Sequence, residues 1–127
     1  MKYFFDNCIS CKFPPMLRAL GVDAVSLREE FPEAITDVRL FERIKGRNLV
    51  FISTDTRQLT RKQEELALKQ AGVTALYFGP FFEKKLLWDQ AIWLVLRWRQ
   101  IDGFACGVAP GTCAEIKQNG KALVYPL

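Results

Sequence analysis

Short runs of apolar residues alternate along the chain with segments whose apolar residues recur at helical spacing. The apolar runs predict strands at residues 2–5, 23–27, 48–53 and 73–78. The segments between and after them predict helices at residues 15–20, 37–45 and 60–70, and a long aromatic-rich helix at 81–100. Strands that alternate with helices indicate a mostly parallel sheet covered on both faces, which is an α/β fold.

Residues with special backbone preferences set several of these boundaries. Gly21, Gly46 and Gly72 each follow a predicted helix, where glycine commonly ends one. Thr36 or Asp37 is expected to cap the second helix at its N-terminus.

Turn pairs mark the C-terminal part of the chain. Asp102-Gly103 predicts a turn after the long helix, and Asn119-Gly120 predicts a β-hairpin between residues 114–116 and 122–125. With 127 residues, the chain is expected to form one domain, with a core over residues 2–100 and a C-terminal hairpin extension over 103–127.

Two of the predicted strands run directly into an aspartate. Asp6 follows the first strand, Asp55 follows the run at 48–54, and Asp37 opens the helix between them. Open α/β sheets bind ligands outside the carboxyl ends of their strands, and carboxylate oxygens are preferred ligands of Mg²⁺ and Mn²⁺. The pattern favours a metal-dependent phosphodiesterase. Three neighbours either orient water or phosphate or hydrogen-bond to local backbone: Asn7, Ser53 and Thr54.

Charge adds support for an anionic partner. The net charge is +4 and the isoelectric point is near 9.0. Seven basic residues lie between positions 39 and 62, against three acids from 37 to 62. Three residues just beyond Asp55 are candidates for RNA phosphate contacts or, equally, for a solvated surface: Arg57, Arg61 and Lys62.

Composition excludes several other classes of function. The chain has no histidine, so zinc sites and general bases that depend on histidine are ruled out. The N-terminus lacks the pattern of a signal peptide, and the most apolar helical stretch, residues 86–98, contains charged residues and is too short to span a bilayer. We therefore expect a cytoplasmic protein without a membrane partner.

The four cysteines form a Cys8-x-x-Cys11 pair and a Cys106-x6-Cys113 pair. The first follows a strand and precedes a helix, as in thiol oxidoreductases, and this activity is one alternative function. A four-cysteine zinc site would need a tighter second pair. Reduced cysteines without a chemical role are the interpretation we prefer.

The long aromatic helix carries apolar residues around most of its circumference, including Trp88, Trp93 and Trp98. A helix that is apolar all round is usually buried. It either packs under the hairpin as core, or is shared between the core and an interface with a second copy or another partner.

The order of these segments resembles a known family. The runs 3–7, 37–41 and 50–55, followed by 57–61, 64–68 and 71–73, are similar to PIN-like domains of the VapC toxin type, in particular to their compact branch. The resemblance covers roughly residues 2–100. It implies a three-layer PIN-like fold and a Mg²⁺- or Mn²⁺-dependent endoribonuclease held in check by a cognate antitoxin.

The resemblance also assigns site residues. The family's metal-binding and catalytic acids correspond to Asp6, Asp37 and Asp55, with Glu64 as a fourth catalytic candidate. A distinctive glutamate-bearing helix between the first two aspartates is missing, although Glu29, Glu30 and Glu33 lie there. A catalytically inactive PIN-like module that binds RNA or a partner is the remaining alternative.

Overall fold

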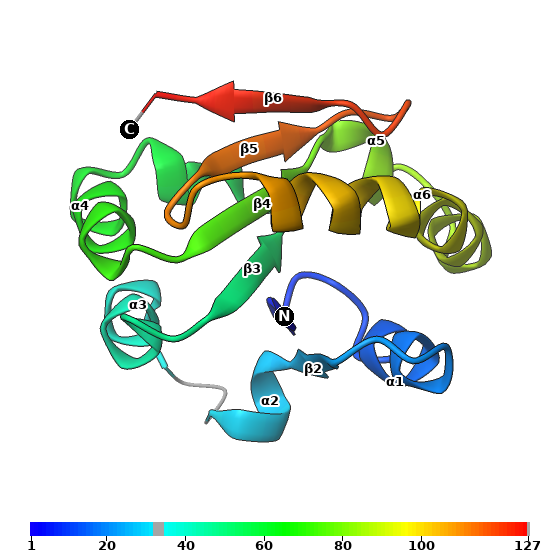
Figure 1. The fold of residues 1–127 in the computed structure, drawn as a ribbon, viewed down its shortest axis with the longest axis horizontal. Helices are drawn as coiled ribbons and strands as arrows, with labels where there is room; N and C mark the ends of the chain where they lie inside the picture. The colour runs from blue at the N-terminus through cyan, green and yellow to red at the C-terminus, as the bar shows by residue number, and fades with distance from the viewer. Residues whose placement is uncertain (32–34, 127) are drawn as a thin grey trace.

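The computed structural model describes residues 1–31 and 35–126, apart from the side chain of Lys62. In that part of the chain, a single sheet contains the strands β1 (Lys2–Phe5), β2 (Ala24–Ser26), β3 (Leu49–Ser53), β4 (Thr74–Phe78), β5 (Cys113–Ile116) and β6 (Ala122–Tyr125). The strand order is β2-β1-β3-β4-β5-β6. Neighbours run parallel except β5 and β6, which form an antiparallel hairpin (Figure 1). The predicted α/β fold with a mostly parallel sheet and a C-terminal hairpin is confirmed.

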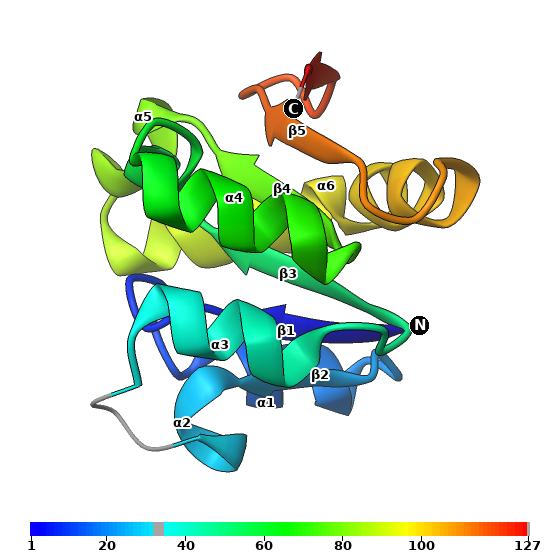
Figure 2. The same ribbon diagram turned by 90° about the vertical axis from the view of Figure 1, so that its left-hand side faces the viewer.

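Helices cover both faces of this sheet and make three layers. The helical elements are α1 (Phe13–Ala19), α2 (Leu27–Glu30), α3 (Asp37–Ile44), the 3-10 helix η1 (Thr56–Leu59), α4 (Lys62–Ala71), α5 (Pro80–Glu83) and α6 (Leu87–Gly107). Residues of α1, α5 and α6 share one core with the sheet, and residues of α2, α3 and α4 share the other. Figure 2 looks onto the side of α3 and α4, with the sheet behind them.

The central strands β3 and β4 are mostly apolar because both of their faces are buried along the whole strand. In β3, Val50 and Ile52 point into the core under α1 and α6, whereas Phe51 points into the core under α3 and α4. Phe51 packs edge-on against Phe41 of α3, with ring centroids 5.5 Å apart. This alternation fixes the register of β3, because a shift by one residue would exchange its two faces.

Two predicted helix boundaries are present. Thr36 is the N-cap of α3, and its Oγ1 accepts a hydrogen bond from the backbone N–H of Arg39 at 3.3 Å. Gly72 ends α4 with φ of 65°, a left-handed conformation that glycine adopts without steric cost.

The predicted continuous helix over 81–100 and the turn at Asp102-Gly103 are wrong. A short α5 ends at Glu83, and α6 begins at Leu87 and continues to Gly107. Tertiary contacts stabilise the helix on both sides of Gly103. Ile101 and Ala105 are buried, and the Asp102 carboxylate accepts a hydrogen bond from the Tyr3 hydroxyl. Packing overrides the weak helix preference of one exposed glycine.

The long helix is divided between core and solvent. Trp93 and Trp98 are buried, and the Trp93 indole N–H donates to the backbone oxygen of Gln118 near the hairpin. Trp88 and Leu96 are exposed. None of the helices in the described residues is long and apolar enough to cross a membrane.

The strands β1 and β3 lie side by side in the interior of the sheet, with Phe5 opposite Ile52. The chain leaves β1 toward α1 on one face, and leaves β3 toward α4 on the other face. Connections that diverge in this way open a crevice at the carboxyl ends of the strands. Asp6 and Asp55 lie at this position.

Candidate metal and phosphate site

A cleft of about 420 Å³ lies at the carboxyl ends of β1 and β3. The side chains of Asp6, Asp37 and Asp55 all line it. The other lining residues are Cys8, Thr54, Thr56, Arg57 and Glu83. Three aspartates from separate segments of the sequence therefore face one space, which concentrates negative charge there.

Asp6 forms the buried floor of this cleft. Its backbone N–H donates to Ile52 O at 2.8 Å, which extends the pairing of β1 and β3 by one residue. Its carboxylate accepts hydrogen bonds from the Ser53 hydroxyl at 2.8 Å and from the Asn7 backbone N–H at 2.8 Å. Burial raises the pKa of Asp6, and these hydrogen bonds oppose that effect. The nearby charge of Asp37 also raises the Asp6 pKa.

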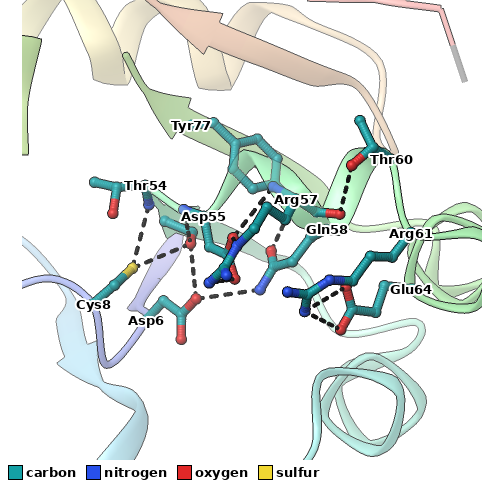
Figure 3. Close-up of polar contacts among 11 residues, drawn as sticks. Asp6, Cys8, Thr54, Asp55, Arg57, Gln58, Thr60, Arg61, Glu64 and Tyr77 are labelled. Carbon is teal, nitrogen blue, oxygen red and sulfur yellow. Dashed lines mark hydrogen bonds and ion pairs between the residues drawn. The ribbon is translucent and has the colours of Figure 1, made fainter. Parts of the chain in front are cut away.

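A fully buried glutamine also holds Asp6 (Figure 3). Gln58 of η1 donates its side-chain N–H to Asp6 Oδ2 at 3.3 Å, and its Oε1 accepts from the Tyr77 hydroxyl of β4 at 3.0 Å. An ionised carboxylate only accepts hydrogen bonds, so the amide nitrogen must face Asp6 and the amide oxygen must face Tyr77. The chain from Tyr77 through Gln58 to Asp6 thus fixes the orientation of the carboxylate.

Asp55 is held differently, because a guanidinium covers it. Arg57 Nε lies 2.8 Å from Asp55 Oδ1 and Arg57 Nη2 lies 3.4 Å from Oδ2. The backbone N–H of Arg57 also donates to Oδ1, at 3.2 Å, since Asp55 is the N-cap of η1. Both carboxylate oxygens of Asp55 are therefore in contact with a cation that the chain itself supplies.

Asp37 and Glu64 lie on the α3 and α4 side. Asp37 is the first residue of α3, and because Thr36 is the cap, the Asp37 carboxylate is not needed for that role. Glu64 lines a neighbouring hollow together with Asp37, and not the cleft of Asp6 and Asp55. The Glu64 carboxylate accepts from Arg61 Nη1 at 3.2 Å. The structure thus brings three of the four predicted acids to one cleft and places Glu64 beside it.

The glutamates between the first two aspartates have structural partners or lie outside the described residues. Glu29 accepts from the Ser26 backbone N–H at 2.6 Å and completes the capping box of α2. Glu30 pairs with Lys2 at 2.7 Å. Glu33 lies outside the described residues.

The donor set of this cleft suits a hard divalent cation, because it consists of carboxylate oxygens. Thr54 adds a second indication: its buried Oγ1 has no hydrogen-bond partner among the described residues. An unpaired buried hydroxyl costs about 1–3 kcal/mol, which a bound water or phosphate oxygen would recover. In the observed conformation, however, residues 1–31 and 35–126 contain no group of three Asp, Glu or Cys side chains close enough to hold one ion.

Of the predicted RNA-contacting residues, Arg57 lines the cleft and Arg61 lines the neighbouring hollow with Asp37 and Glu64. Arg57 and Arg61 are both exposed, and each is paired with an acid, Asp55 and Glu64 respectively. The side chain of Lys62 lies outside the described residues.

The Cys8 thiol is directed toward the floor of the cleft. Its Sγ lies 3.4 Å from Ser53 Oγ and accepts from the Thr54 backbone N–H at 3.4 Å. Burial, followed by the charge of Asp6, raises the pKa of the Cys8 thiol, so the nucleophilic thiolate is disfavoured. All four cysteines are free thiols. The raised pKa of the Cys8 thiol counts against the thiol oxidoreductase.

Sequence reasoning missed Gln58, Tyr77 and Glu83. Glu83 could have been found from the sequence. It follows β4, and the carboxyl ends of parallel strands lie at the same edge of a sheet, where Asp6 and Asp55 also lie. Gln58 and Tyr77 carried no such signal, since one lies in a polar loop and the other in an apolar strand.

Comparison with known proteins agrees with this architecture. The model of a family described as "PIN like domain" matches residues 1–79. The chain therefore belongs to the PIN-like domain family, a nuclease-type family whose members are generally metal-dependent. Among the curated proteins and the solved structures, the chain has no significant match.

Proposed function

We propose that this protein is a metal-dependent endoribonuclease that hydrolyses RNA phosphodiester bonds, and that it is the toxin of a toxin–antitoxin pair acting in the cytoplasm. The observation that carries the proposal is the convergence of Asp6, Asp37 and Asp55 on one cleft. The unpaired Thr54 hydroxyl in the same cleft supports it, because that atom lacks a partner that an oxygen-rich ligand would supply.

Asp6, Asp37 and Asp55 would hold Mg²⁺ or Mn²⁺, with Glu64 or Glu83 available as a further acid. A bound divalent ion lowers the pKa of a coordinated water and neutralises charge on the phosphate. Crowded carboxylates repel one another unless a cation neutralises them; burial is the main cause of the raised pKa of Asp6, and the charge of Asp37 adds to it.

The other residues of the cleft orient the reacting groups. Ser53 and Gln58 fix the Asp6 carboxylate, and Asn7 donates its backbone N–H to the same group. Thr54 is placed to accept or donate a hydrogen bond to water or to a phosphate oxygen. Arg57, Arg61 and Lys62 would contact RNA phosphates, which bind guanidinium and ammonium groups through charge-assisted hydrogen bonds.

The antitoxin or a second copy of the chain would bind the exposed side of α6. Trp88 and Leu96 are 78% and 75% exposed, and tryptophan on a surface favours protein contacts. Lys84 and Lys85 outnumber the one acid, Asp89, in a hollow that also includes Leu96, so an acidic partner is favoured there.

A PIN-like module that binds RNA without cleaving it is the second candidate. The observation that favours it is the separation of the acids, since no three of them in the described residues are grouped to hold one ion. In such a module, the Arg57 guanidinium would serve permanently as the counter-ion of Asp55.

Cleavage of a labelled mixed RNA pool, with and without Mn²⁺, separates the two candidates. The ribonuclease is expected to cleave only with the metal, and Asp6→Asn should abolish cleavage while leaving the protein folded. Asp23→Asn makes the same chemical change at an exposed residue before β2, and should cleave like the wild type. Metal-independent behaviour, or full activity of Asp6→Asn, would exclude the metal-dependent ribonuclease.

Growth of cells that express the protein alone tests the toxin assignment. Arrest by the wild type and normal growth with Asp6→Asn are expected. Unimpaired growth at a verified level of active enzyme would leave a ribonuclease that is not a toxin.

A further inference from the structure

The Arg57 guanidinium occupies the position that a metal bound by Asp55 would need. Its Nε and Nη2 contact Oδ1 and Oδ2 of the same carboxylate, so a cation that approaches Asp55 meets both oxygens already engaged by the guanidinium (Figure 3). Asp6, Asp37 and Asp55 line one cleft, yet no three acids of the described residues are grouped closely enough to hold one ion.

We propose that Arg57 and the divalent metal compete for Asp55, and that Arg57, once displaced by the metal, binds a phosphate of the RNA. This inference rests on the proposed function, because it names the residue that couples metal binding to substrate binding at the same site. It assigns two alternating partners to one side chain, the Asp55 carboxylate before the metal binds and a phosphate afterwards.

Releasing Arg57 from Asp55 should cost little free energy. Its side chain is 69% exposed, and an ion pair in contact with water contributes little to stability. Asp55 is more enclosed, at 18%, and also keeps the hydrogen bond from the backbone N–H of Arg57. Releasing the guanidinium thus leaves the carboxylate held by η1 and open to a cation.

The displaced guanidinium remains at the rim of the cleft, because Arg57 itself lines it. Phosphate offers the same pair of oxygen acceptors as a carboxylate, and the planar arginine fork binds either group with two parallel hydrogen bonds. Lysine offers a point charge and lacks this fork. Metal entry would therefore create a phosphate-binding group beside the metal.

Titration calorimetry with Mn²⁺ on the full-length protein, without RNA, is the first test. Arg57→Gln should bind Mn²⁺ more tightly than the wild type, by a factor of about three to ten, because a hydrogen-bonded competitor is removed. Arg61→Gln is the matched control, because it removes one positive charge from another exposed arginine paired with an acid. Only the effect of Arg57→Gln beyond that of Arg61→Gln counts as competition.

Kinetics with the labelled RNA pool provide the second test. Here Arg57→Gln is expected to weaken binding, of RNA, whereas in the first test it strengthens binding, of Mn²⁺. At saturating Mn²⁺, Arg57→Gln should raise the KM for RNA by about tenfold, the loss expected for a charge-assisted contact. Arg57→Lys retains the charge and loses the fork, so it should lie between the wild type and Arg57→Gln in both measurements.

The outcomes distinguish failure of the inference from failure of the proposed function. If the wild type binds no Mn²⁺, the metal-dependent function itself is wrong. If Mn²⁺ binds and Arg57→Gln has no tighter affinity than Arg61→Gln, the competition is refuted and the ribonuclease proposal stands. Tighter Mn²⁺ binding with an unchanged KM would refute the transfer of Arg57 to a phosphate.

Discussion

The side-chain amide of Gln58 lies 3.3 Å from Asp6 Oδ2, and both residues are buried. A polar side chain with no exposed surface needs partners for all of its hydrogen-bonding groups, and Tyr77 supplies the other one. The orientation of the predicted metal ligand thus depends on two residues that would not touch the metal.

The Tyr77 hydroxyl can be removed without changing the shape of the side chain. Tyr77→Phe leaves the buried Gln58 Oε1 without a partner, and we expect it to lower the free energy of unfolding by about 1–3 kcal/mol. Because the freed amide can turn away from Asp6, Mn²⁺ affinity should fall as well. Urea unfolding and calorimetry measure the two effects.

Tyr125→Phe is the control for that substitution. Its hydroxyl donates to Glu115 at 2.7 Å in a partly exposed setting, so its loss should cost about 1 kcal/mol or less and leave Mn²⁺ affinity unchanged. Equal effects of the two substitutions on metal affinity would refute a positioning role for Tyr77.

The pKa of Asp6 predicts how stability depends on pH in the absence of metal. Burial raises the pKa of the folded carboxyl above its unfolded value. Between these two values the folded chain keeps a proton that the unfolded chain has lost, so the free energy of unfolding falls as pH rises through this window. Asp6→Asn removes that contribution.

Urea unfolding of both proteins from about pH 3 to pH 7 measures the difference. The free energy of unfolding of Asp6→Asn, relative to that of the wild type, should rise with pH. Other acids, such as Glu29 and Glu30, have lowered pKa values and contribute with the opposite sign, but they are common to both proteins and cancel in the difference. A constant difference between the curves would contradict the raised Asp6 pKa.

The Cys8 thiol is expected to react slowly although Cys8 lines the cleft. Its raised thiol pKa predicts slow alkylation by iodoacetamide at neutral pH compared with the same cysteine in the urea-unfolded chain. Mass spectrometry of the labelled peptide gives both rates. Cys8→Ser should retain RNA cleavage, and a loss of thiol-exchange activity in this variant would instead support the oxidoreductase.

The two sides of α6 should respond differently to truncation. Trp93 is 6% exposed, so Trp93→Ala should lower the free energy of unfolding by about 3–5 kcal/mol. Trp88 is 78% exposed, so Trp88→Ala should change it by no more than about 0.5 kcal/mol. Urea unfolding measures both. A large cost for Trp88→Ala at low protein concentration would show that this side chain supports the fold and not a partner contact.

The strand ends could be predicted from the sequence because parallel strands align their carboxyl ends. An apolar run followed by Asp6, and another followed by Asp55, therefore implied a shared edge. The end of α6 could not be predicted, since its last turns depend on the buried Ile101 and on the contact of Asp102 with Tyr3, a residue about a hundred positions away. Gln58 was hidden for a related reason: only tertiary structure shows that a glutamine in a polar loop is buried.

The backbone bond from Asp6 N–H to Ile52 O makes the first aspartate a continuation of the pairing between β1 and β3. Its amide hydrogen should therefore exchange with solvent only when the sheet itself opens, whether or not a ligand is present. Adaptation to different ligands is left to the exposed side chain of Arg57, which can move without disturbing the strands. The floor of the cleft is thus fixed by the sheet, whereas the arginine at its rim can change its position.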